Sequence, residues 1–302
     1  MSWRRETLGP GWGLTIADLG SQKTAAPHGV AFHGMAALDD IRLKVSRATQ
    51  HLDALSKEIR EVFTEHQSYL TGQHNPVDDS YTAILHEVPP VSREWGLVLG
   101  ECVHHARGAL DHLVAALVIA DGGAVGNRHQ FPICRHPKEW QSQVMPRRGN
   151  GKLDFIKPAH VAFIESIQPY QTGIGFPSLN TLQRFSNADK HRLIHGAIMR
   201  TVARPALTGQ LAIPLRITEV IYADPNTPVD EGIAVARYKA PAEVSPIIGM
   251  PVPGSQVHIH AKIRLTTVFG EPGHEDTRIA DFRTVLSNVS AIVDNFTGVL
   301  TL

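Results

Sequence analysis

A short stretch of the chain, residues 101–112, crowds together side chains that carry charge or transfer protons. They are Glu101, His104, His105, Arg107, Asp111 and His112. On a helix, which turns by about 100° per residue, all of them fall within an arc of about 160°. Imidazole titrates near neutral pH and serves as a general acid or base, and a guanidinium can bind a phosphate through two hydrogen bonds. The stretch is therefore a candidate site for acid–base chemistry.

The helix that carries this stretch is expected to be buried. Residues 113–120 are apolar on every side of the helix, which is typical of a helix surrounded by other elements. A buried polar group must be paired or must serve a function. Arg107 and His112 point about 140° apart around the helix axis, so they either flank a phosphate from two sides or face different partners. Both alternatives stay open.

A carboxylate on an apolar helix face is the second unusual feature. Asp189 shares a face with Leu182 and Phe185 in the helix that is predicted to begin at Ser178. A carboxylate there needs a cation or several hydrogen bonds, and Arg107 is the natural partner. This pair is either a structural link that fixes the register of two helices or a part of an active site.

A metal site is the rival interpretation of the histidines. His105 and His112 share a helix face and could hold a metal together with His104 or Asp189, although no diagnostic ligand spacing is present. Two further pairs lie among charged residues on faces that are expected to be wet; they are His191 with His195, and His258 with His260. The sequence contains no phosphate-binding glycine loop, dinucleotide fingerprint or nucleophile elbow. No cofactor is therefore expected, and nucleotide hydrolysis, dinucleotide redox chemistry and esterase action are disfavoured.

The spacing of apolar residues predicts the elements that must position these side chains. Intervals of three and four predict helices, and strict alternation predicts strands. The predicted helices span 38–62, 92–121, 137–144, 159–168, 178–193 and 279–300. The predicted strands span 81–88, 211–217, 233–238 and 257–265.

These elements predict an α+β fold, in which a bundle of about four main helices carries an antiparallel β portion inserted before the C-terminal helix. Residues 1–34 are Gly-rich without sustained periodicity and are expected to form an extended N-terminal arm. The helical bundle is expected to comprise 35–200 and 276–302, and the β portion 201–275. Whether the β portion is an independent domain stays open.

Composition narrows the class of protein. The 302 residues carry 29 basic and 29 acidic side chains, so no overall charge marks nucleic acid or membrane as a partner. The two cysteines, Cys102 and Cys134, do not support a disulfide framework. No apolar run is long enough to span a bilayer, and the first residues lack the pattern of a signal peptide. We therefore expect a soluble, cytoplasmic protein with no membrane partner.

Four short motifs together resemble a widespread set of bacterial helical proteins. The motifs are Arg107-Gly-Ala-Leu-Asp-His-Leu113, Phe131-Pro-Ile133, Ile167-Gln-Pro-Tyr170 and Asp189-Lys-His-Arg192. The resemblance covers roughly residues 36–200, and the last motif is its most specific part. That set of proteins carries no established activity, so the resemblance implies a shared fold more than a function.

The spacing of Arg107, four residues and His112 also resembles the HEPN superfamily, helical-bundle proteins that include metal-independent ribonucleases of toxin, phage-defence and RNA-decay systems. The resemblance implies a dimer in which this Arg and His meet their counterparts. It implies that His112 assists proton transfer and that Arg107 stabilises the phosphate transition state. Asp111 or Asp189 would then orient an imidazole. The chain departs from the pattern at Gly108, where a polar residue is usual, and in its large β portion.

Three functional hypotheses follow from these observations. The first is a HEPN-like ribonuclease or RNA-binding effector in defence or stress, acting on RNA as a dimer. Its candidate site residues are Arg107, His112, His104, His105, Asp111 and Asp189. The second is a non-catalytic binding or assembly protein, in which the polar cluster is a structural network and the β portion carries the partner surface. The third is a histidine-based metalloenzyme.

Overall fold

The computed structural model describes the fold over most of the chain. The described residues are 34–78, 80–145, 151–173, 175–191, 196–201, 206–207, 218–223, 228–239, 256–259, 261–262, 265–270 and 276–300. The predicted arm, apart from Gly34, and the predicted strand at 211–217 lie outside these residues. Helices and antiparallel sheets are both present, which confirms the predicted α+β class.

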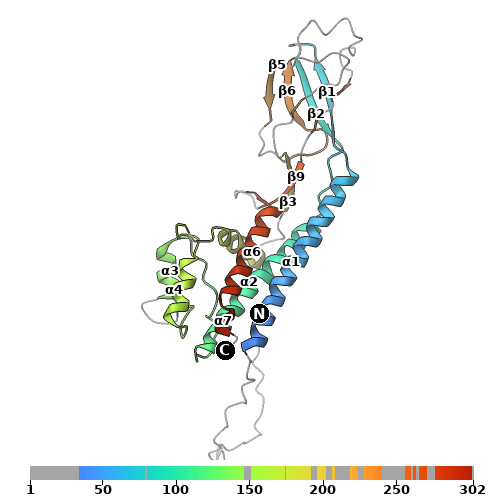
Figure 1. Cartoon of the computed structure of the whole chain (residues 1–302). Coiled ribbons are helices and arrows are strands. Elements are labelled where there is room, and N and C mark those ends of the chain that lie inside the picture. The colour runs from blue at the N-terminus through green and yellow to red at the C-terminus, as the bar shows by residue number, and fades with distance from the viewer. Residues whose placement is uncertain are drawn as a thin grey trace, which may run out of the picture. The chain divides into compact units, whose positions relative to one another are not determined.

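Long helices that pack side by side form the helical part of the protein (Figure 1). Helix α1 (Gly34–Glu65) packs along α2 (Glu94–Ala120), and α6 (Ile279–Asn295) packs against both. Helix α5 (Ser178–His191) contacts α2 and α6. The shorter described helices are α3 (Pro137–Val144), α4 (Pro158–Ser166) and α7 (Thr297–Leu300).

The spacing of apolar residues explains which face α1 buries. Its apolar positions from Leu38 to Ile59, at intervals of three and four, are each 9% exposed or less. Burial of each large aliphatic side chain contributes about 1.5–3 kcal/mol. The ion pairs that α1 forms with α6, such as Arg42 with Asp294 at 3.0 Å, are exposed and contribute less. The apolar face therefore holds α1 in place.

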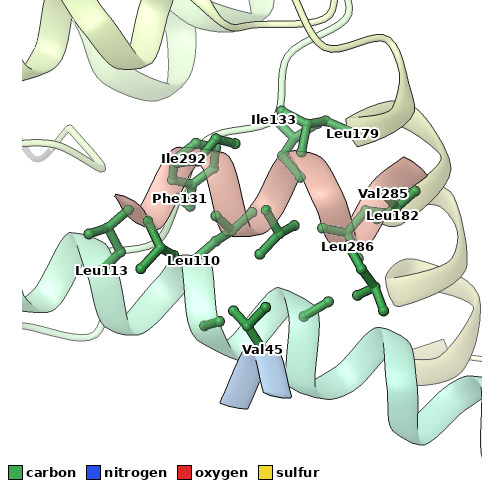
Figure 2. Close-up of a cluster of buried hydrophobic side chains, with 14 of the residues drawn as sticks. Val45, Leu110, Leu113, Phe131, Ile133, Leu179, Leu182, Val285, Leu286 and Ile292 are labelled. Atoms are coloured by element: carbon green, nitrogen blue, oxygen red, sulfur yellow. The ribbon is translucent and has the colours of Figure 1, made fainter. Parts of the chain in front are cut away.

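The main hydrophobic core surrounds α2 and includes a connection between helices. Figure 2 shows apolar side chains from α1, α2, α5 and α6 and from the segment that follows α2. The labelled residues are Val45, Leu110, Leu113, Phe131, Ile133, Leu179, Leu182, Val285, Leu286 and Ile292. Phe131, which lies in the connection, is fully buried. A connection at this depth needs partners for its backbone N–H and C=O groups.

An antiparallel five-stranded sheet joins two distant parts of the chain, in the order β5-β6-β2-β1-β7. Its strands are β1 (Tyr69–Asn75), β2 (Ser80–His86), β5 (Thr218–Tyr222), β6 (Ala234–Lys239) and β7 (Gln256–Ile259). The predicted strands at 81–88 and 233–238 correspond to β2 and β6. Strand β1 is not predicted from the sequence, because Gly72 and the polar residues that follow it do not favour strands.

Shorter strands link the sheet region to the helices. Strand β9 (Leu265–Gly270) pairs with β3 (Gly196–Thr201) and with β10 (Thr277–Arg278), which leads directly into α6. Strand β4 (Ala206–Leu207) pairs with β8 (Ala261–Lys262), so the predicted strand at 257–265 is divided among β7, β8 and β9. Over the part of the chain that the structure describes, no helix is long and apolar enough to cross a membrane.

Candidate functional site

Arg107 lies inside the helical part of the protein and is bonded on three sides. Its side chain is 8% exposed, and its Nη2 lies 3.0 Å from Asp111 Oδ1. Nη2 also donates a hydrogen bond of 2.6 Å to the carbonyl of Phe131, and Nη1 donates one of 3.3 Å to Gln183 Oε1 of α5. Burial lowers the pKa of Arg107, and the Asp111 carboxylate opposes this shift. A guanidinium nevertheless stays charged at physiological pH.

The connection Phe131–Cys134, here called the buried segment, receives its hydrogen bonds from side chains. Asp111 Oδ1 accepts the first N–H of the segment at 2.9 Å. Gln168, which is fully buried, accepts the last N–H of the segment at 2.8 Å and donates to the carbonyl of Pro132 at 3.0 Å. An unpaired buried backbone group costs about 1–3 kcal/mol. Arg107, Asp111 and Gln168 therefore permit the segment to lie in the core.

Three of the four sequence motifs meet at the buried segment. Arg107 and Asp111 belong to the first motif, the segment contains the second, and Gln168 belongs to the third. Holding a connection in the core is a structural role, and it gives a physical reason for these motifs to occur together. The fourth motif begins at Asp189, whose side chain lies outside the described residues. The Arg107–Asp189 pair therefore stays a prediction.

His112 faces a different neighbour from Arg107. It is exposed, and its charged neighbours are Lys44 and Asp40 of α1 and Asp111 of its own helix. Partial desolvation and Lys44 lower the pKa of His112, and the two carboxylates oppose the shift. Arg107 is directed toward the buried segment and α5. Within one chain, Arg107 and His112 therefore lie in separate environments. Of the two alternatives that the sequence left open, this is the one in which they face different partners.

A group of imidazoles lies where α2 packs on α1. The rings of His51 and His105 are stacked, with centroids 5.6 Å apart and planes 12° apart, and His104 meets His105 edge-on at 5.9 Å. His51 Nδ1 lies 3.3 Å from Glu101 Oε2. His105 Nδ1 is buried, and the described residues provide it with no hydrogen-bond partner. His51 is not among the site residues predicted from the sequence, because no pattern within one helix gives its register against another.

Burial and positive charge together disfavour the protonated form of His105. Desolvation lowers its pKa most, and the positive charges of His51, His104, Lys44 and Arg47 lower it further. At neutral pH the His105 imidazole is therefore uncharged. An uncharged imidazole can accept a proton, so this group is the part of the predicted site that the structure leaves open to acid–base chemistry.

A hydroxyl, an imidazole and a carboxylate also lie in a row beside the sheet. Thr71 Oγ1 of β1 is 2.8 Å from His86 Nε2 of β2, and His86 Nδ1 is 3.1 Å from Glu231 Oε1. This arrangement has the geometry of a nucleophile relay. Thr71 is only 1% exposed, so a substrate cannot reach its hydroxyl. The row links β1, β2 and the segment before β6 instead.

The two buried thiols offer little chemistry. Burial raises the pKa of Cys102 to about 12 and that of Cys134 to about 11, so both thiols stay protonated.

Within the described ranges, no group of three or more His, Cys, Asp and Glu side chains could hold a metal ion. The side chains of the other predicted histidine pairs lie outside those ranges: His191 with His195, and His258 with His260.

Comparisons with known proteins add no relative to this description. A scan against protein-family models and searches of curated proteins and of solved structures all returned no match.

Proposed function

We propose that this protein is a non-catalytic binding or assembly protein, in which the polar cluster of α2 builds the fold and does not react with a substrate. The observation that carries the proposal is the environment of Arg107. This residue is 6% exposed and is engaged by acceptors of its own chain, namely Asp111, the Phe131 carbonyl and Gln183. A group that stabilises a transition state must be available to the substrate, and the guanidinium of Arg107 is already occupied.

Incubation of the purified protein with RNA in excess chelator tests this proposal. A non-catalytic protein leaves the RNA intact. Cleavage by the wild type that disappears in Arg107→Ala and in His112→Ala, while circular dichroism shows both variants folded, would overturn the proposal. His136→Ala is the matched control, because His136 is also an exposed histidine and lies elsewhere, before α3.

A metal-independent ribonuclease is the second candidate function, and the exposed histidines of α2 favour it. His104 and His112 are exposed, Lys44 lies near His112, and Lys44 and Arg47 lie near His105, which is in ring contact with His104. Two imidazoles and a cation can supply the acid, base and positive charge that phosphodiester cleavage needs. In its HEPN-like form this function requires a second copy of the chain. This candidate predicts that RNA cleavage rises with the fraction of dimer, which sedimentation velocity measures. RNA cleavage by the monomer, or no cleavage by the dimer, would contradict it.

A further inference from the structure

We propose that the face shared by α1 and α2 binds an anion that carries several phosphate groups, and that it binds this anion more tightly as the pH falls. This face, here called the imidazole face, comprises Lys44, Arg47 and His51 of α1 with His104, His105 and His112 of α2. The inference rests on the proposed function, because it names the class of ligand for a binding protein.

The packing of the two helices places positive groups along a line. Helices α1 and α2 lie side by side over much of their length (Figure 1). Lys44 Nζ lies 3.7 Å from the position that a Cβ on Gly108 would take, so Lys44 reaches α2 between His105 and His112. These two histidines are separated along the helix by about 10 Å, at a rise of 1.5 Å per residue. The line is longer than one phosphate group, which favours an oligophosphate over orthophosphate.

The charge of the imidazole face depends on its histidines. When His105 and His112 are neutral, the carboxylates of Asp40 and Glu101 balance the charges of Lys44 and Arg47. Protonation of His105 and His112 then adds positive charge in excess, because Asp40 and Glu101 already balance Lys44 and Arg47, and Asp111 is paired with Arg107. Like charges held this close repel one another unless a counter-ion is bound. An anion supplies that counter-ion.

The hydrogen-bonding capacity of the face is also incompletely used. His105 Nδ1 is buried, and no described residue forms a hydrogen bond with it. His51 Nδ1 lies 3.3 Å from Glu101 Oε2. Protonated His112, whose side chain is exposed, donates from both ring nitrogens, so acidification adds donors that a phosphate oxygen can reach.

The direction of the pH dependence follows from linkage. Burial and neighbouring positive charges hold the pKa values of His105 and His112 below their usual value of 6.5. A bound anion stabilises the protonated imidazoles and so raises these pKa values. Binding is therefore coupled to proton uptake, and affinity rises by up to about tenfold per pH unit for each proton taken up.

Titration calorimetry of the full chain with tripolyphosphate, at about pH 5.5 and 7.5 and constant ionic strength, tests the inference. We expect binding at the lower pH that is at least about tenfold tighter than at the higher pH. A short single-stranded oligonucleotide is the second probe, because its phosphodiesters do not titrate in this range. Binding of tripolyphosphate assigns the face to a free oligophosphate, and binding of the oligonucleotide alone assigns it to a nucleic-acid backbone. Binding of neither probe overturns the inference.

Two pairs of variants separate this face from general charge effects. Lys44→Gln with Arg47→Gln should weaken binding about tenfold or more. Lys57→Gln with Arg60→Gln removes the same charge from exposed positions elsewhere on α1 and should change binding less than about twofold. Equal weakening by both pairs contradicts the proposal.

A histidine variant tests whether protonation of the imidazoles causes the pH dependence of binding, and a measurement of RNA integrity separates this inference from the proposed function. His112→Gln keeps a polar side chain at an exposed position and should reduce the pH dependence of binding. A full pH dependence in this variant would contradict the role of the imidazoles. RNA integrity, measured after the same protein preparation has been incubated with RNA, distinguishes the two failures. Absence of binding with intact RNA refutes only this inference, whereas cleaved RNA refutes the non-catalytic function.

Discussion

Replacement of Arg107 by alanine should destabilise the protein strongly, because the residue holds the buried segment. The change leaves the Phe131 carbonyl without its donor and Asp111 without its cation. Removal of one partner from a buried ion pair costs about 3–5 kcal/mol. The Asp111 side chain is 25% exposed and keeps the N–H of Phe131, so water and that bond offset part of the loss. We therefore expect a loss of about 3 kcal/mol in the free energy of unfolding.

Equilibrium urea unfolding, followed by circular dichroism, measures this loss. Arg107→Lys should recover part of it, because a lysine can pair with Asp111 but lacks the planar fork that also reaches Phe131 and Gln183. Arg60→Ala, an exposed position on α1, is the control and should stay within about 0.5 kcal/mol of the wild type. An Arg107→Ala variant as stable as the wild type would refute the structural role of Arg107 and would support a catalytic one.

Three further predictions follow from other described residues. Gln168→Leu should lower the free energy of unfolding by about 2–4 kcal/mol, because it leaves the Cys134 N–H and the Pro132 carbonyl unpaired in the core. Urea unfolding measures this loss with the exposed Gln141→Leu as control, and a loss smaller than that of Gln141→Leu would contradict the prediction. Gly108→Ala should raise the unfolding free energy by about 0.5–1 kcal/mol, since the added Cβ meets only Lys44 at ordinary contact distance; a lower melting temperature would show that the face is tighter than described. The lowered pKa values of His105 and His112 predict a stability contribution that is fully present above pH 6.5 and is lost as the pH falls through their folded-state pKa values. His105→Gln should therefore reduce the dependence of the unfolding free energy on pH, measured by urea unfolding at several pH values, and an unchanged dependence would contradict the prediction.

The helices were predictable because their packing repeats along the sequence. The interval of three and four in α1 matches its buried face from Leu38 to Ile59. Strand β1 was not predictable in this way, since Gly72 and its polar neighbours carry no such pattern and owe their strand to pairing with β2 and β7. Local patterns thus identify elements whose own side chains build the core.

The candidate site was predictable only as far as one helix carries it. The burial of Arg107 followed from the apolar turns of α2, but its bond to a backbone carbonyl did not, because the Phe131 carbonyl leaves no mark on the sequence. The stacking of His51 on His105 depends on the register of α1 against α2, which the spacing within each helix does not fix. Contacts between distant elements therefore had to come from the structure.

The buried segment has a consequence for the order of folding. Its described backbone partners are side chains from α2 and from the turn after α4, and they come into reach only after those helices have assembled. The amide hydrogens of Phe131 and Cys134 should consequently exchange with solvent slowly and together, because both are protected only once the helical core has formed around the segment. A chain arrested before that closure would keep its long helices and expose the aromatic ring that they enclose.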